Sequence, residues 1–554
     1  MKTNVVMIQQ NQTAEWSFQS GKSRKDPFNE VELSVRFTSA DGGEKLVPAF
    51  WAGGRNWRVR FSSPMAGKFH FRTVCSDPSD SGLHDREGDV QVKRYVGSNP
   101  LFRHGPIRVA ADKHHFEHTD GTPFLWLGDT WWMGLTKRLV WPKGFQTLLK
   151  DRVKKGFTVI QIVAGLYPDM AWGDKRGVNE AGFPWDKDFN RINPAYFDKA
   201  DRRIQRLVEA GMAPCIVGCW GYFLPLMGVE KMKKHWRNLV ARYGSYPTIW
   251  CLAGEGTMPY YLSTNKEEDA KFQKKGWTEL GAYVRKIDPY RRPVTIHPSS
   301  SARFCVEDPS VLDFDMLQTG HGDRNSLPNT VKLVSRAYQT TPAMPVVEGE
   351  VCYEGIGEFC RQEVQRWIFW ACMLNGAAGF TYGANGIWQI NTRKKPYGPS
   401  PHGMTWGNTP WEDAYRLPGS EHVGLAKRLL SRYPWWQFES HPEWVEPGWT
   451  RELFEVPYTS GRHDIPLAAG IPGRVRIIFW PMGTGLHKVK GLEQGLCYRL
   501  KLVNPATGKE HDGGEVKPDA AGNWVPAFPG LPAWCPLPIY QDWVLVLEAK
   551  GAGT

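Results

Sequence analysis

Eight short apolar segments recur between residues 124 and 382, and this repetition constrains the fold more than any other feature of the sequence. The segments begin at Phe124, Phe157, Ala213, Thr248, Pro293, Phe314, Pro345 and Gly379. Six amphipathic segments lie between them, and several end in glycine, as helix C-termini often do. Alternation of this kind predicts a parallel sheet, and eight repeats predict a closed (β/α)8 TIM barrel.

The regions on either side of this alternation have the pattern of antiparallel strands. Residues 1–97 alternate apolar and polar positions, with Gly, Pro and Asp between the runs, which predicts a β-sandwich. A hairpin with a turn at Asp120 and Gly121 follows. Short strand-like runs return from about residue 436. We therefore expect a multidomain chain: a β-sandwich over 1–97, the barrel over 98–435 and a C-terminal β-sandwich over 436–554.

The composition excludes several classes of protein. Hydrophobic residues make up 41% of the chain and charged residues 23%, as in globular proteins. No run is long enough to cross a membrane, and the first residues lack the apolar core of a signal peptide. The net charge of +12 is dispersed and no basic recognition motif occurs, so we expect no nucleic-acid partner. Ten cysteines without close pairing favour reduced thiols and a cytoplasmic location.

Two glutamates, Glu255 and Glu350, end candidate strands four and seven, each beside a glycine. The C-terminal ends of barrel strands surround the pocket, so the barrel would bring the two carboxyl groups together. One carboxylic acid and one carboxylate are what hydrolysis of a glycosidic bond requires, with either inversion or retention. A strand-end glutamate can instead cap a helix or form a salt bridge. Glu348 lies two residues before Glu350 on the same expected strand face, so it remains an alternative nucleophile.

Other residues at the strand ends have the polar and aromatic character of a sugar pocket. A lone histidine at a strand end is, however, more often structural than catalytic. The residues expected to bind substrate are Asp129, Trp131, Trp220, His297, Gln318, His321, Glu348, Tyr353, Tyr382 and Trp388.

The histidines His114, His115 and His118 have a spacing that could hold zinc on a helix. Their segment has the pattern of a hairpin, and no HExxH motif occurs in the chain. We therefore expect neither a metal nor a cofactor.

Four strand-end sequences resemble those of the apiosidase-like family of (β/α)8 glycoside hydrolases. They are FLWLGDTWW at 124–132, FDMLQTGHG at 314–322, PVVEGEVCYEG at 345–355 and GFTYGANGIW at 379–388. The resemblance extends over about residues 100–430. The preceding segment resembles an immunoglobulin-like domain, and the C-terminal region resembles a small β-domain labelled as collagen-binding.

The resemblance implies a role for each glutamate. Glu350, which precedes Tyr353 and Glu354, would be the nucleophile, and Glu255 the acid/base, in a retaining mechanism. Similar family members more often have Asp at the position of Glu255. The resemblance therefore leaves the identity of the sugar open, and apiose is one candidate. We expect exo action on a terminal sugar of an oligosaccharide or glycoside. The alternative is a non-catalytic carbohydrate-binding protein on a degenerate barrel, which would not need the carboxylate pair.

Overall fold

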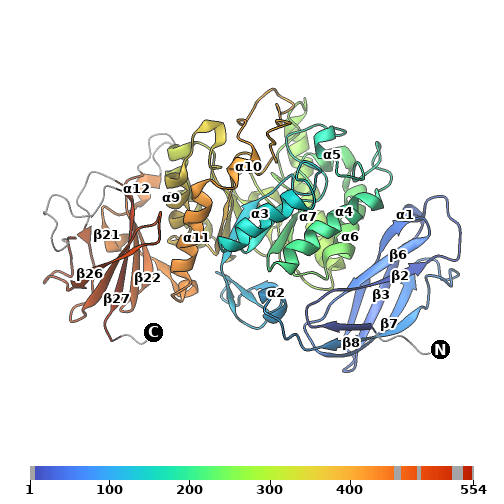
Figure 1. Cartoon of the computed structure of the whole chain (residues 1–554), viewed down its shortest axis with the longest axis horizontal. Helices are drawn as coiled ribbons and strands as arrows, with labels where there is room; N and C mark the ends of the chain where they lie inside the picture. Colours follow the sequence, from blue (N-terminus) through green and yellow to red (C-terminus); the bar gives the residue numbers. More distant parts are fainter. Residues whose placement is uncertain (1–5, 455–462, 483–487, 527–540, 552–554) are drawn as a thin grey trace.

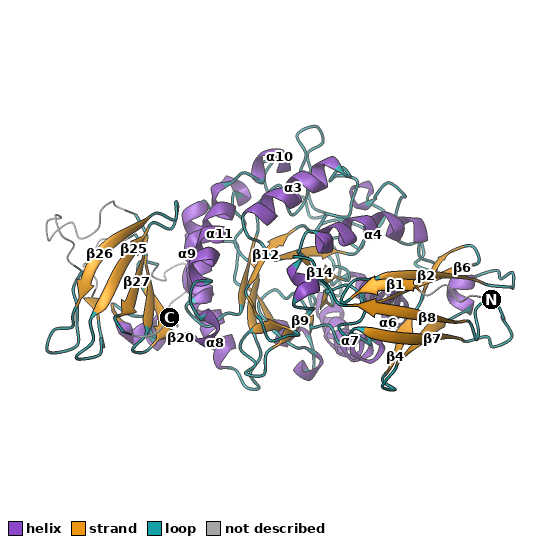
Figure 2. Cartoon of the chain, turned by 60° about the horizontal axis from the view of Figure 1, so that its bottom comes forward, coloured by secondary structure: helices purple, strands orange, loops and turns teal. Residues whose placement is uncertain are grey.

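The computed structural model describes residues 6–454, 463–482, 488–526 and 541–551. Figures 1 and 2 show a parallel barrel in the middle, with antiparallel sheets of the N-terminal part on one side and of the C-terminal part on the other. The predicted multidomain fold with a central TIM barrel is therefore confirmed. The predicted domain boundaries fall between β8 (Glu87–Lys93) and α2 (Pro100–Arg103), and at the start of η6 (Trp435–Gln437).

Eight parallel strands form the barrel. In sheet order they are β16 (Val294–Thr295), β15 (Ile249–Cys251), β14 (Ala213–Val217), β13 (Val159–Val163), β12 (Trp126–Thr130), β19 (Gly379–Tyr382), β18 (Val346–Glu350) and β17 (Asp315–Gln318). The two end strands, β16 and β17, meet through individual hydrogen bonds. The N–H of Asp313 donates to the carbonyl of Val294 at 2.7 Å, and the Thr295 hydroxyl donates to the carbonyl of Phe314 at 2.9 Å.

Helices cover the outside of the barrel, and all six amphipathic segments expected from the sequence are helical. They are α3 (Lys143–Lys154), α4 (Pro194–Glu209), α6 (Val229–Tyr243), α7 (Lys266–Ile287), α8 (Leu327–Gln339) and α9 (Gln362–Met373), with α11 (Pro418–Leu430) following β19. Shorter helices are α1 (Pro27–Glu30), α5 (Phe223–Met227), α10 (Trp411–Ala414) and α12 (Arg451–Phe454). Between β16 and β17 the connection contains two short 3-10 helices instead, η2 (Ala302–Cys305) and η3 (Pro309–Val311).

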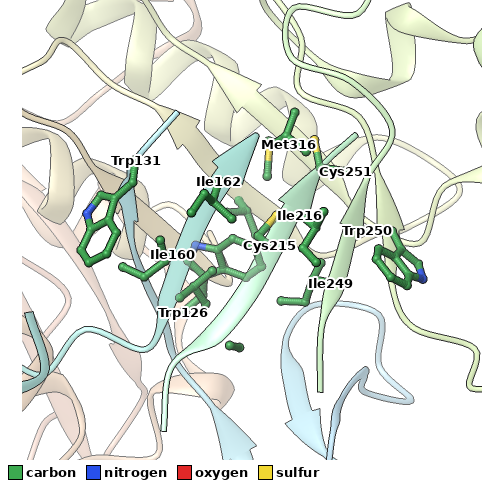
Figure 3. Packing of buried hydrophobic residues seen from close by; sticks show 14 of the residues in the cluster. Trp126, Trp131, Ile160, Ile162, Cys215, Ile216, Ile249, Trp250, Cys251 and Met316 are labelled. Carbon is green, nitrogen blue, oxygen red and sulfur yellow. The ribbon is translucent and has the colours of Figure 1, made fainter. Parts of the chain in front are cut away.

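Apolar residues fill the barrel and the layer between strands and helices, as Figure 3 shows. Trp126 packs against Phe314 and against Phe116 of β10 (Phe116–His118), with ring centroids 5.8 and 5.9 Å apart. Strand β10 lies between β9 (Ile107–Val109) and β11 (Pro123–Phe124) in the expected hairpin. Because Phe116 contacts Trp126, the first residue of β12, the hairpin lies at the end of the barrel opposite the strand C-termini. Trp131 and Trp250 lie on the outer side of the strands, toward the helices.

The N-terminal part consists of two sheets with an aromatic core between them. One sheet has the order β1 (Val6–Gln9), β8, β7 (Gly67–Cys75), β3 (Leu33–Ser39) and β4 (Glu44–Pro48). The other has the order β2 (Ala14–Gln19), β6 (Asn56–Phe61) and β5 (Phe50–Gly53). The rings of Phe37 and Phe61, one from each sheet, stack with centroids 4.0 Å apart.

A buried ionic cluster joins the N-terminal part to the barrel. Asp201 of α4 accepts hydrogen bonds from Arg60 of β6 at 2.6 Å and from Arg242 of α6 at 2.9 Å. Arg60 also donates to the backbone carbonyl of Arg242 at 2.8 Å. The Phe50 ring lies 4.1 Å from the Arg242 guanidinium and 5.1 Å from that of Arg60. Asp201 is thus a buried carboxylate shared by two buried cations. Two further, more exposed carboxylates add to it: Glu15 lies 2.8 Å from Arg60, and Asp198 lies 3.2 Å from Arg242.

The described C-terminal residues form a six-stranded sheet and a two-stranded ribbon. The sheet order is β20 (Glu439–Ser440), β22 (Leu467–Ile471), β23 (Val475–Trp480), β27 (Trp543–Ala549), β25 (Tyr498–Val503) and β26 (Glu510–Val516). The ribbon pairs β21 (Val445–Glu446) with β24 (Lys488–Val489). Alternate residues of the sheet belong to two cores: Phe479 stacks on Trp370 of α9, whereas Trp480 and Trp543 pack in a separate cluster on the other face.

Among the residues that the structure describes, no helix has both the length and the apolar character needed to cross a membrane.

We predict that Asp201→Ala destabilises the protein by about 3–5 kcal/mol, because it leaves two buried guanidinium groups without their shared counter-charge. Unfolding followed by calorimetry or fluorescence should show a transition at a lower temperature or a lower denaturant concentration than in the wild type. Arg202→Ala, an exposed change one position along the same helix, serves as the matched control. An Asp201→Ala variant that unfolds together with the control would contradict this role of the cluster.

Candidate active site

Glu255 lies just beyond β15, in a backbone conformation that is rare for a residue with a side chain. Its φ is 42°, in the left-handed region. Its N–H donates to Nδ1 of His297 at 3.4 Å, and the next N–H, of Gly256, donates to the carbonyl of His297 at 2.9 Å. Its own carbonyl accepts from the N–H of Met258 at 2.8 Å. These contacts hold a strained backbone in place, which is a common property of functional sites.

Glu350 is the last residue of β18, and its carboxylate is surrounded by nitrogen atoms. Oε1 lies 2.9 Å from Nε2 of His321 and accepts a hydrogen bond from the Gln318 amide at 3.2 Å. Oε2 lies 3.1 Å from Nε2 of His297. Nδ1 of His297 accepts the N–H of Glu255, so Nε2 is the ring nitrogen that faces Glu350.

One amide group contacts both glutamates. Nε2 of Gln318 lies 3.2 Å from Oε1 of Glu350 and 3.5 Å from Oε1 of Glu255. The Oε1 atoms of Glu255 and Glu350 can therefore be no farther apart than the sum of these two distances. The indole N–H of Trp220 donates to the other oxygen of Glu255 at 3.3 Å. The barrel thus brings together two carboxyl groups that the sequence separates widely.

The surroundings shift the pKa values of the two glutamates in opposite directions. Burial raises the pKa of Glu255, and the nearby charge of Glu350 raises it further. Burial also acts to raise the pKa of Glu350, but the imidazole groups of His297 and His321 outweigh it and lower the pKa. The site therefore favours a protonated Glu255 beside an ionised Glu350, which is the arrangement of an acid and a nucleophile or base.

Both glutamates line a cavity of about 470 Å³ that opens to solvent, a size typical of small-ligand sites. Its walls are largely aromatic. The indole N–H of Trp132 donates to the Tyr353 hydroxyl at 3.0 Å, and the rings of Tyr353 and Trp388 stack with centroids 6.1 Å apart. The structure therefore gathers most of the expected site residues at one place: Trp220, Glu255, His297, Gln318, His321, Glu350, Tyr353 and Trp388.

Glu348 lies outside this cavity, although two residues on a regular strand share a face. The pairing of β17 with β18 shifts register between Leu317 and Gln318, so Glu350 pairs with Gln318 while Glu348 pairs with Leu317. The irregularity changes the direction of Glu350 relative to Glu348. Glu348 lies instead near Thr319 and Cys372 of α9, and burial raises its pKa well above the ordinary value. A carboxyl group held neutral is poorly suited to nucleophilic attack.

Asp129, Trp131 and Tyr382 also lie outside the cavity, behind strands β12 and β19. Asp129 is fully buried and accepts from the Trp131 indole at 2.7 Å and from Arg152 of α3 at 2.6 Å. The Tyr382 hydroxyl donates to Glu354 at 2.5 Å. These residues join the strands to the helix layer, because neighbouring positions at a strand end alternate between the pocket and the helices.

Besides Pro168 and Ile356, four polar or aromatic residues of the pocket were not among those expected from the sequence: Trp132, Asp169, Tyr261 and Trp406. Trp132 directly follows Trp131, so strand alternation could have identified it. The other three lie in long connections after strands β13, β15 and β19, where no local pattern indicates which side chains enter the pocket.

The histidines near residue 115 have ordinary partners. His115 Nδ1 lies 2.8 Å from Asp112, and His118 Nδ1 lies 2.6 Å from the carbonyl of Gly105. Over the described part of the chain, no group of three or more His, Cys, Asp or Glu side chains has a geometry that could hold a metal ion.

Comparisons with known proteins agree with this architecture. Residues 110–437 match the family model described as "Apiosidase-like, catalytic domain", and residues 7–76 match a domain family of unknown function (DUF5060). No curated protein matches the chain. The relation of the C-terminal region to a small β-domain stays a prediction.

Several solved structures share the fold. One described as a glycoside hydrolase is 21% identical, with a TM-score of 0.65, over 83% of this chain and 100% of its own. A glycoside hydrolase family 5 structure from Bacteroides vulgatus is 21% identical, with a TM-score of 0.66, over 82% and 94%. A further structure from that organism is 17% identical, with a TM-score of 0.67, over 98% and 100%. Because the family model spans more than half of the sequence, the chain belongs to the apiosidase-like catalytic-domain family.

Proposed function

We propose that this protein is a retaining, exo-acting glycoside hydrolase that releases a terminal sugar from a glycan. The observation that carries the proposal is the position of two carboxyl groups in a single pocket, one surrounded by imidazole and amide nitrogens and the other beside it. Glu350 contacts two imidazole groups and an amide, whereas Glu255 is half-buried beside the negative charge of Glu350. Membership of the apiosidase-like family supports glycosidase chemistry.

In the proposed first step, a carboxylate oxygen of Glu350 attacks the anomeric carbon while Glu255 gives its proton to the departing glycosidic oxygen. The product is a glycosyl ester of Glu350. Ester formation removes the charge on Glu350, and with it a cause of the raised pKa of Glu255. Glu255 then accepts a proton from water, which attacks the anomeric carbon, releases the sugar and frees Glu350. The acid of the first step thereby becomes the base of the second.

The contacts of Gln318 favour retention over inversion. Retaining glycosidases hold their carboxyl groups about 5–5.5 Å apart, whereas inverting enzymes separate them by about 6.5–9.5 Å to leave room for water. Because one nitrogen lies within 3.5 Å of an oxygen of each glutamate, the facing oxygens are less than about 7 Å apart, which excludes most of the separations of inverting enzymes, although not the shortest of them.

The aromatic walls favour action on a terminal sugar. Rings of Trp132, Trp220, Trp388 and Trp406 line the cavity together with Tyr261. Indole and phenol rings can pack against the apolar face of a sugar ring. Walls of this bulk favour a pocket for one chain end over a groove that a continuous polysaccharide could cross.

We predict that Glu350→Gln lowers kcat by on the order of 10⁴-fold or more, because the nucleophile is lost. Glu348→Gln is the matched control: it preserves the shape of a neutral side chain outside the pocket, so turnover should stay close to that of the wild type. Initial rates on aryl glycosides measure both. The opposite result, an inactive Glu348→Gln and an active Glu350→Gln, would transfer the nucleophile to Glu348.

We predict a bell-shaped dependence of kcat/KM on pH. Activity rises as the pH increases through the lowered pKa of Glu350, which must be ionised, and falls as it increases through the raised pKa of Glu255, which must be protonated. In Glu255→Gln the high-pH limb should disappear. A 2,4-dinitrophenyl glycoside needs no proton on its leaving group, so it should still form the glycosyl ester, and azide should then accelerate turnover. An unchanged high-pH limb would contradict the role of Glu255.

The stereochemistry of the product tests the mechanism directly. Hydrolysis of a responsive aryl glycoside, apiosides included in the panel, should release the sugar first with its original anomeric configuration, as followed by proton NMR before mutarotation. Release of the opposite anomer would establish inversion. Binding of sugars without any hydrolysis would instead favour the carbohydrate-binding alternative.

A further inference from the structure

Asp169 is a third carboxyl group in the pocket, and it has no part in the reaction proposed above. It lies in the connection between β13 and α4, beyond the end of β13 at Val163. It lines the same cavity as Glu255 and Glu350, and only 3% of its surface is exposed. A buried carboxyl group at the wall of a ligand site needs a partner, because an unpaired buried polar group costs free energy.

The backbone around Asp169 is held in a specific and unfavourable conformation. Its φ is 59°, in the left-handed region. The Tyr222 hydroxyl contacts the carbonyls of Tyr167 at 2.8 Å and Met170 at 2.9 Å, one on each side of the Pro168–Asp169 pair. The Tyr397 hydroxyl donates to the carbonyl of Pro168 at 3.4 Å. Contacts from two other connections thus fix the direction of the Asp169 side chain, as in a site organised before its ligand binds.

Polar atoms without a hydrogen-bond partner lie around the cavity. Among the described residues, neither Oδ2 of Asp169 nor the indole N–H of Trp388 has a partner of ordinary hydrogen-bond geometry. The indole N–H of Trp406 also lacks such geometry, but Trp406 and the Tyr261 hydroxyl lie close enough to the Asp169 carboxyl group to act on its pKa and lower it. All four residues line the cavity. A sugar hydroxyl both donates and accepts hydrogen bonds, so one acceptor beside two donors matches a glycone with free hydroxyl groups.

The charges around the cavity disfavour an acidic sugar. The lining contains three carboxyl groups, one imidazole and no lysine or arginine. Arg176 acts electrostatically on Asp169, but its guanidinium already contacts Asp174 at 2.7 and 2.9 Å and the carbonyls of Tyr397 and Pro399. A uronic acid would therefore add a further negative charge without gaining a free cation.

We propose that Asp169 is a specificity-determining residue of the glycone site, which accepts hydrogen bonds from sugar hydroxyl groups and selects neutral sugars over acidic ones. This inference rests on the proposed glycosidase function, and it names a residue that binds the sugar in the same pocket. Trp388 and Trp406 supply the matching donors. The glycone is then held from the β13 connection on one side and by the two glutamates on the other.

The first test compares Asp169→Asn and Asp169→Ala with the wild type on 4-nitrophenyl glycosides of neutral pentoses and hexoses and on the matching uronides. We expect turnover of neutral glycosides only, and a KM raised about 10-fold or more in Asp169→Ala, with a smaller effect on kcat, because a hydrogen bond between the sugar and the Asp169 carboxyl group is lost. Asp188→Asn, an exposed change in the same connection, is the control and should leave both constants unchanged. A uronide hydrolysed as well as its neutral counterpart would overturn the proposal.

Monodeoxy forms of the best substrate separate recognition from a general structural effect. The wild type should lose about 10-fold in kcat/KM when the hydroxyl bound by Asp169 is absent, whereas Asp169→Ala should lose nothing further at that position. Equal losses in both proteins at every deoxy position would mean that Asp169 contacts no hydroxyl, and would overturn the proposal.

Calorimetric titration distinguishes failure of this inference from failure of the proposed function. Free neutral pentoses and hexoses are titrated into the wild type, Glu350→Gln and Asp169→Ala. Binding that Asp169→Ala weakens, without any glycoside hydrolysis, supports the recognition role and rejects the hydrolase. Hydrolysis with binding and KM unaffected by Asp169→Ala supports the hydrolase and rejects the recognition role. Absence of both binding and hydrolysis rejects both.

Discussion

Closure of eight parallel strands is the constraint on which the site depends. Each parallel connection must return the chain to the opposite end of the sheet, so all strand C-termini meet at one end of the barrel. Residues on β15, β17 and β18 and in the connections after them can therefore contribute to one small pocket. Gln318 shows the consequence most directly, because a single amide on β17 contacts carboxyl groups that follow β15 and end β18.

The repeated apolar segments predict the barrel, and the glutamates at two strand ends predict the centre of the site, because both follow from the topology. The face on which a strand-end residue lies was harder to predict. Trp131 and Trp132 are adjacent in one motif, yet the first packs against Phe145 of α3 and the second lines the pocket. Regular alternation likewise placed Glu348 beside Glu350, whereas the register shift separates them. Strand irregularities depend on pairing with a neighbour, which a single sequence does not display.

The part of the site in long connections could not be predicted for a different reason. The backbone on either side of Asp169 is held by hydroxyl groups of Tyr222 and Tyr397, which lie about 50 and 230 residues later in the sequence. A loop conformation fixed by such distant contacts leaves no periodic pattern in its own residues. The connection between β16 and β17 differs in this respect, because the sequence has no amphipathic segment there and the structure has only two short 3-10 helices.

The buried cluster of Arg60, Asp201 and Arg242 bears on how such a protein can evolve. An accessory domain on a flexible tether can be exchanged between enzymes, since few residues on either side depend on the other. Here the guanidinium of Arg60 is shared between Glu15 of the sandwich and Asp201 of the barrel, and Asp201 is shared in turn between Arg60 and Arg242. Replacing either part by recombination would remove one hydrogen-bond partner from a buried charged group in the other. The two parts are therefore expected to be inherited as one unit, so that the N-terminal sandwich belongs to the ancestry of this barrel rather than to a pool of movable modules.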